Sequence, residues 1–180
     1  MGLMTGLEQI CAQAIHTTRR IEVTVFDPKP PGPGLHAVDH PEYLMLNTVA
    51  SQISMFPDAA ALGGHMGRQG PNFYEWCLRF ESAERRVQPN EVLPRSWLGD
   101  YLAWTYEQMI FSLPVNVRVV YRARAVDNID HTDMGQFVLS TGERIVQWSG
   151  LRLLSATRSR RRVRRVAARG IRRLFTIWRR

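Results

Sequence analysis

Lysine is nearly absent from this sequence, although the chain is strongly basic. Of its 24 Lys and Arg residues, only Lys29 is a lysine. Phosphate groups and membrane surfaces accept both cations, so binding chemistry does not explain this ratio. GC-rich coding, which favours arginine codons, is the simpler hypothesis. The arginine content alone is therefore weak evidence for a nucleic-acid or membrane partner.

Acidic residues are missing from the last thirty positions. Residues 1–150 hold 12 basic and all 16 acidic residues, a net charge of −4, whereas residues 151–180 hold 12 arginines and no acid, a net charge of +12. The formal charge of +8 therefore describes no single surface. With 44% apolar and 22% charged residues, the chain has ordinary globular composition, which excludes disorder of the whole chain.

Cysteine and long apolar runs are also scarce. Cys11 and Cys77 lie far apart with no CxxC spacing, so neither a disulfide framework nor a zinc site is indicated. The histidines are scattered without metal-ligand spacing, and we expect solvated or capping roles for them. No apolar run approaches the roughly 18 residues of a membrane span, and the N-terminal segment lacks signal-peptide features. These absences predict a cytoplasmic protein without a metal site.

The hydrophobic pattern predicts an α/β domain. Helical spacing over residues 5–18 is followed by a β-branched strand over residues 21–26, the order found in the second half of a βαβ unit. A Pro- and Gly-rich loop then opens a long irregular region. Further along we expect helices over residues 73–80 and 96–111, a strand over residues 115–125 that could continue to 129, and a hairpin around residues 141–142.

Gly6 and Asp27 have the spacing of a dinucleotide-binding βαβ unit. In such units a helix N-terminus holds the pyrophosphate, and an acid about 20 residues later accepts hydrogen bonds from the adenosine ribose. Asp27 follows Gly6 by 21 residues. A complete GxGxxG motif is lacking, since Met1 and Leu3 occupy the positions of its first two glycines. The alternative is a loop glycine before a helix and an ordinary turn-forming Asp-Pro.

Five motifs, in order along the chain, resemble the FAD/NAD(P)-binding domain of the L-aspartate N-monooxygenases (nitrosuccinate-forming) and related flavin-dependent hydroxylases. They are IEVTVFDP at 21–28, PGPG at 31–34, LMLNTVAS at 44–51, GPNFYEW at 70–76 and PRSWLGDYL at 94–102. The resemblance covers about residues 3–146. It implies a Rossmann-like domain that binds FAD, takes its electrons from NADPH and serves the hydroxylation of a small-molecule substrate by oxygen.

The resemblance also implies roles for individual residues. Gly6 matches the last glycine of the pyrophosphate motif, and Asp27 matches the ribose-binding acid. Asn47 and Thr48 match a polar pair whose amide could face the flavin, and Arg95 could offset phosphate charge. From the residues alone, Asn47 could instead cap a helix that starts near Thr48, and Arg95 could be a solvated residue at a helix start. No catalytic acid or base is assigned, because the flavin carries the reaction chemistry.

Aromatic residues are frequent between positions 73 and 104. They could form a flavin-stacking surface, but their number and helical spacing favour a place in the core. The residues concerned are Tyr74, Trp76, Trp97, Tyr101 and Trp104.

The sequence departs from the family pattern at both ends. The family's opening strand and first glycines would precede Met1, and after residue 146 its hydrophobic strand is replaced by an arginine-rich stretch, as a frameshift near residue 147 would produce. We therefore interpret residues 1–148 as a partial FAD/NAD(P)-binding domain with impaired or no activity alone. Residues 149–180 are an Arg-rich tail, disordered or an amphipathic helix. The alternative is a non-catalytic protein that uses this cationic helix on anionic membranes or nucleic acid, a role that we do not favour.

Overall fold

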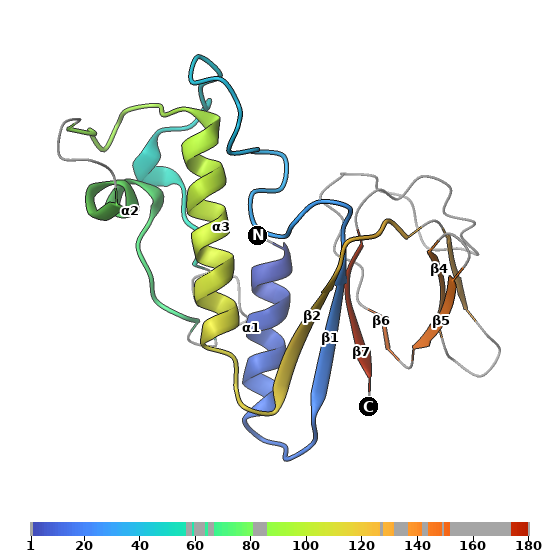
Figure 1. The fold of residues 1–180 in the computed structure, drawn as a ribbon. Helices are drawn as coiled ribbons and strands as arrows, with labels where there is room; N and C mark the ends of the chain where they lie inside the picture. Colours follow the sequence, from blue (N-terminus) through green and yellow to red (C-terminus); the bar gives the residue numbers. More distant parts are fainter. Residues whose placement is uncertain are drawn as a thin grey trace. The chain divides into compact units, whose positions relative to one another are not determined.

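The computed structural model describes residues 6–56, 59, 64, 67–80 and 86–126, and the backbone of residues 2–5, 128–131, 137–141, 144–148, 150–151 and 174–179. The chain divides into two compact units, and Figure 1 shows the elements of both. The first unit contains Leu3–Gln9 and Pro31–Ser112, and the second contains Ile10–Pro30 and Leu113–Arg180. Each unit is described by itself below.

Helix α1 (Gly2–Ala14) contributes residues to both units. Its first residue lies three residues before the predicted start at residue 5, and its last residue lies four residues before the predicted end at residue 18. Leu7, Cys11 and Ala14 are buried, and their spacing of four and three residues places them on one stripe of the helix. This stripe confirms part of the predicted apolar face, because Ile10 is only half-buried and Ile15, which follows the end of the helix, is exposed.

Asn116 closes the end of α1 within the second unit. Its side-chain Nδ2 donates to the backbone carbonyls of Ala14, Thr17 and Arg19 at 3.0, 2.8 and 3.2 Å. Its own carbonyl accepts from the backbone N–H of Ile21 at 2.7 Å. The last carbonyls of a helix have no partner within it. The Asn116 side chain therefore supplies donors to the last carbonyl of α1 and to two carbonyls of the turn after it, and its backbone carbonyl fixes the start of the next strand.

Strand β1 (Ile21–Phe26) lies inside the sheet of the second unit. It pairs in parallel with β2 (Val117–Arg122), from Ile21 opposite Val117 to Phe26 opposite Arg122. On its other edge it pairs antiparallel with β7 (Leu174–Arg179), and the strand order is β2-β1-β7-β6, with β6 at Gly150–Leu151. Every residue of β1 except Glu22 is buried, as expected of a near-continuous apolar strand in a covered sheet.

A separate antiparallel sheet contains β3 (Asn128–His131), β4 (Phe137–Thr141) and β5 (Arg144–Trp148). The β4–β5 pair is the predicted hairpin. Strand β3 pairs with β4 and not with the first sheet. The expectation that the strand over residues 115–125 could continue to 129 is therefore wrong.

Strands β6 and β7 belong to the predicted Arg-rich tail. Residues 174–179 are extended in β7, which corrects the helical alternative for this stretch. Their sequence, LFTIWR, contains the aromatic and β-branched residues that favour strands over helices. Residues 152–173, the remainder of the predicted helix, lie outside the described residues.

In the first unit, α2 (Phe73–Phe80) starts where a reciprocal cap places it. The backbone N–H of Glu75 donates to Asn72 Oδ1 at 2.8 Å, and the backbone N–H of Asn72 donates to Glu75 Oε2 at 3.0 Å. Such a pair satisfies two N–H groups that a helix start leaves unpaired. The predicted bounds of this helix are confirmed.

Helix α3 (Arg95–Phe111) supplies much of the first unit's core, with the 3-10 turn η1 (Ala50–Gln52) and α2. Tyr101 is fully buried, and its hydroxyl donates to the carbonyl of Pro71 at 2.8 Å and accepts from the backbone N–H of Met55 at 3.1 Å. The core interpretation of the aromatic residues is confirmed. The buried members of the core are Ala50, Phe73, Trp76, Cys77, Val87, Leu93, Leu98 and Tyr101, with Tyr74, Trp97 and Trp104 packed against them.

The Pro- and Gly-rich loop lies along α3. Gly32 has a φ of +123°, and a Cβ on it would lie 2.8 Å from Ala103 Cα. Four residues later, the carbonyl of His36 is so close to Gly99 that no Cβ fits there. Glycine is therefore required at both contacts, at Gly32 for its backbone conformation and at Gly99 for the space.

Candidate functional site

A short backbone ladder joins the segment before η1 to the segment before α3. The N–H of Leu46 donates to the carbonyl of Leu93 at 2.9 Å, and the N–H of Arg95 donates to the carbonyl of Leu44 at 2.8 Å. This pairing is what brings the LMLNTVAS and PRSWLGDYL motifs together. Three of the five predicted site residues therefore lie at one place, the N-terminal end of α3.

Asn47 and Thr48 follow directly on the first segment of this ladder. Asn47 is exposed and Thr48 is half-buried, and Thr48 Oγ1 donates to Asn47 Oδ1 at 3.4 Å. The helix that Asn47 could cap is only the 3-10 turn η1, whose N-cap residue is Val49 with no side-chain cap hydrogen bond. The capping alternative for Asn47 is therefore wrong, and its side chain faces solvent.

Arg95 is the first residue of α3, and its side chain is exposed. Its Nε donates to the carbonyl of Met45 at 3.1 Å, which holds the guanidinium at the ladder. The N-cap residue of α3 is Pro94, without a side-chain cap, and the first turn contains no acidic residue. The N–H groups and the positive dipole end of a helix favour anions, so this end of α3 is electropositive.

Two histidines that the sequence analysis did not single out lie at the same end. His36 contacts Gly99, which lies one helical turn after Arg95 and so on the same face of α3. Burial, and then the positive charges of Arg95 and His40, lower the pKa of His36. The Nδ1 atoms of His36 and His40 are buried without a hydrogen-bond partner among the described residues.

The solvated or capping roles that we expect for histidines do not hold for these two Nδ1 atoms, although His36 and His40 as whole residues are half-buried. Buried polar nitrogens without partners cost free energy and call for an explanation. In the sequence, the only signal is the spacing of 36 and 40 in a Pro-Gly loop, and nothing there connects them to Arg95.

Asp27 follows β1 in the second unit and is buried, with 4% of its surface exposed. Its Oδ1 accepts from the backbone N–H of Lys29 at 2.9 Å, and its carbonyl accepts from the hydroxyl of Tyr121 at 2.9 Å. Desolvation, and then the charge of Asp27, raise the pKa of Tyr121. Asp27 therefore forms the turn of the alternative interpretation. This does not exclude a ligand, because a carboxylate has about four acceptor positions.

Gly6 is the fifth residue of α1 and is buried. It therefore lies inside the helix and not before it, so its own N–H is not one of the unpaired groups of the first turn. This is the place of the last glycine of a dinucleotide motif, which allows close packing of helix and strand. Gly6 belongs to the first unit and Asp27 to the second.

Metal ligands do not gather in the part of the chain that the structure describes. No group of three or more His, Cys, Asp or Glu side chains is placed there to hold a metal ion. Over the same residues, no helix has both the length and the apolar character needed to cross a bilayer.

A helix followed by the first of two parallel strands, with a buried acid at the strand's carboxyl end, is typical of nucleotide-binding α/β proteins. Comparison with known families agrees with this class. The model of the FAD-NAD(P)-binding family matches residues 2–153. The chain belongs to this family, whose description names FAD and NAD(P) as the dinucleotides that it binds.

Curated relatives confirm the resemblance to the N-hydroxylating monooxygenases. The chain is 34% identical over 144 residues to nitrosuccinic acid synthase of Aspergillus oryzae, with 77% of this chain covered. It is 30% identical over 141 residues to the L-aspartate N-monooxygenase (nitrosuccinate-forming) of Streptomyces davaonensis, with 68% covered. The corresponding enzyme of Streptomyces cremeus is 29% identical over 150 residues, with 72% covered. The matched region spans 22% of each relative's length.

Proposed function

We propose that this chain forms the Rossmann-like, FAD-binding part of a flavin-dependent N-hydroxylating monooxygenase with NADPH as its reductant. The observation that carries the proposal is the buried carboxylate of Asp27 at the carboxyl end of β1, where α/β sheets bind their ligands. FAD, when bound, supplies the redox chemistry. The protein's own residues bind and orient it.

The roles proposed for the residues follow from their positions. Asp27 accepts hydrogen bonds from the adenosine ribose, and the first turn of α1 binds the pyrophosphate, with Gly6 keeping the helix close to its neighbours. At the N-terminal end of α3, Asn47, Thr48 and Arg95 contact the flavin or a phosphate group. The electropositive character of that end supports an anionic ligand there.

The substrate of the whole enzyme is a further proposal. The names of two of the relatives specify L-aspartate as substrate and nitrosuccinate as product. We therefore propose an amino acid whose amine is hydroxylated, and we assign no residue of this chain to it. The division into residues 1–148 and 149–180, the cytoplasmic location and the alternative of a membrane- or nucleic-acid-binding tail stay predictions.

Titration of the full chain with FAD tests the proposed function. Asp27→Asn is the informative variant, because an amide oxygen can still accept from Lys29 and preserve the turn while the charge is lost. A hydrogen bond to a charged group contributes about 1.5–3 kcal/mol, so we expect FAD affinity to fall roughly 10- to 100-fold. Glu22→Gln, a carboxylate near the other end of β1, is the control and should bind FAD like the wild type. A wild-type chain that does not bind FAD would refute the proposal.

A further inference from the structure

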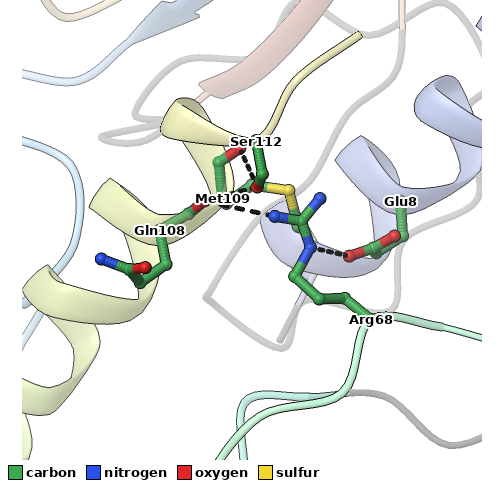
Figure 2. A network of polar contacts seen from close by, with 5 residues as sticks. All are labelled: Glu8, Arg68, Gln108, Met109 and Ser112. Carbon is green, nitrogen blue, oxygen red and sulfur yellow. Dashed lines mark hydrogen bonds and ion pairs between the residues drawn. The ribbon is translucent and has the colours of Figure 1, made fainter.

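Arg68 joins α1 to α3 within the first unit (Figure 2). Its Nε lies 3.2 Å from Glu8 Oε1, and its Nη1 donates to the carbonyl of Gln108 at 3.2 Å. The side chains of Arg68 and Glu8 retain 22% and 11% of their exposure. The pair is therefore largely withdrawn from solvent, where opposite charges attract more strongly than on an open surface.

The second contact of Arg68 lies in the last turns of α3. Ser112 donates its hydroxyl to the carbonyls of Gln108 and Met109, and its backbone N–H also donates to the carbonyl of Met109. Arg68 and Ser112 together therefore supply donors to the carbonyls at this helix end. A guanidinium there also meets the negative end of the helix dipole. Arg68 is thus fixed from two sides and belongs to no helix or strand itself.

Glu8 lies close to the proposed pyrophosphate-binding turn of α1. It follows Gly6 by two residues, and helix side chains lean toward the helix N-terminus. Because a helix rises about 1.5 Å per residue, Glu8 is within roughly 5–9 Å of residues 2–5 along the axis. An unbalanced carboxylate at that distance would repel any anion held by the first turn.

We propose that Arg68 is a positioning residue for dinucleotide binding, which balances the charge of Glu8 and fixes the first turns of α1 to the end of α3 without touching the cofactor. This inference rests on the proposed function, in which the first turn of α1 holds the pyrophosphate of FAD. The ligand group concerned is the anionic diphosphate of the dinucleotide, and Arg68 affects its binding by balancing the charge of Glu8.

Three variants of the full chain separate this charge effect from a loss of structure. Arg68→Gln leaves Glu8 unbalanced and should weaken FAD binding about tenfold, the scale of one extra negative charge within about 10 Å of a diphosphate. Glu8→Gln should bind FAD at least as tightly as the wild type. The double variant E8Q/R68Q removes both charges and should restore FAD affinity to within about threefold of the wild type.

Salt provides a readout that a merely structural role would not change. The deficit of Arg68→Gln should shrink in part between about 0.05 M and about 1 M salt, because the Debye length falls from over 10 Å to about 3 Å. The reduction is only partial, since Glu8 is largely buried and buried charges are screened less than exposed ones. Arg79→Gln, an exposed arginine on α2, is the control and should leave FAD affinity unchanged.

Several outcomes would overturn the inference. If the wild type binds FAD and Arg68→Gln binds it equally well, the inference is wrong and the proposed function stands. If the deficit is neither rescued by E8Q/R68Q nor reduced by salt, the charge argument is wrong. If Arg68→Gln does not fold, E8Q/R68Q decides, since it contains no unpaired charge and must bind FAD near the wild-type level. A wild-type chain that ignores FAD refutes the inference together with the proposed function.

Discussion

Removal of one buried hydroxyl, by Tyr101→Phe, should destabilise the first unit substantially. The hydroxyl donates to the carbonyl of Pro71 at 2.8 Å and accepts from the N–H of Met55 at 3.1 Å. Burial raises the pKa of Tyr101, so the hydroxyl keeps its proton at neutral pH and both hydrogen bonds persist. Phenylalanine retains the ring, whose centroid lies 5.4 Å from that of Phe73, and so the packing is preserved.

The expected magnitude follows from the two groups left behind. Leaving a buried donor or acceptor without a partner costs about 1–3 kcal/mol, which doubles to about 2–6 kcal/mol for two such groups. Because the N–H of Met55 is only partly buried, we expect the lower part of this range, about 2–4 kcal/mol. In a chain of this size, each 1 kcal/mol lowers the melting temperature by about 2–4 °C. We therefore expect Tyr101→Phe to melt about 4–16 °C below the wild type.

Thermal unfolding followed by circular dichroism, with urea unfolding as a second measurement, checks this value. Tyr43→Phe is the matched control, because Tyr43 is 78% exposed and its hydroxyl can be replaced by water at little cost. It should change stability by less than about 0.5 kcal/mol. A loss below about 1 kcal/mol for Tyr101→Phe would refute the assignment of a buried and a partly buried hydrogen bond to its hydroxyl.

Two further predictions concern His36 and Asn116. The pKa of His36 is lowered from its ordinary 6.5, so below about pH 6.5 the unfolded chain takes up a proton that the folded chain refuses. This contribution to stability is present above that pH and is lost as the pH falls toward the lower folded pKa. His36→Gln should flatten the pH dependence of the free energy of unfolding, and an unchanged profile would contradict the shift. Asn116→Ala should lose about 1–3 kcal/mol in urea unfolding, because its amide donates to the carbonyls of Ala14, Thr17 and Arg19 at the end of α1 and in the turn after it. Asn116→Asp, which keeps the size but has no amide donor, should lose at least as much, and near-wild-type stability of both would contradict this role.

Elements with local signals could be predicted from the sequence. Strand β1 and helix α2 have their predicted bounds, because a proline follows Asp27 at the end of the strand and the Asn72–Glu75 cap fixes the start of the helix. The sequence pattern predicts a start of α1 that is three residues late, because glycine has a low helix propensity and Gly6 therefore indicates the beginning of a helix. Its position inside the helix depends on packing, which is not a local property.

Features that depend on distant pairing could not be predicted. The ladder between Leu46 and Leu93 joins two short extended segments. Neither segment has the alternation of apolar and polar residues that predicts an ordinary strand. Without it, Asn47 and Arg95 belong to unrelated motifs. The pairing of Glu8 with Arg68 is equally hidden, since 60 residues separate them and each alone is an ordinary charged residue.

The loop on α3 has a further consequence for how this family can change. Gly32 and His36 are four residues apart and contact Ala103 and Gly99, which are also four residues apart. Surface loops ordinarily tolerate insertions and deletions. Here an inserted or deleted residue between Gly32 and His36 would change this spacing. Either Gly32 would then no longer lie against Ala103, or the carbonyl of His36 would no longer lie against Gly99. We expect length variation among homologues to be excluded from this stretch and to occur after it, so the loop behaves in evolution as part of the core.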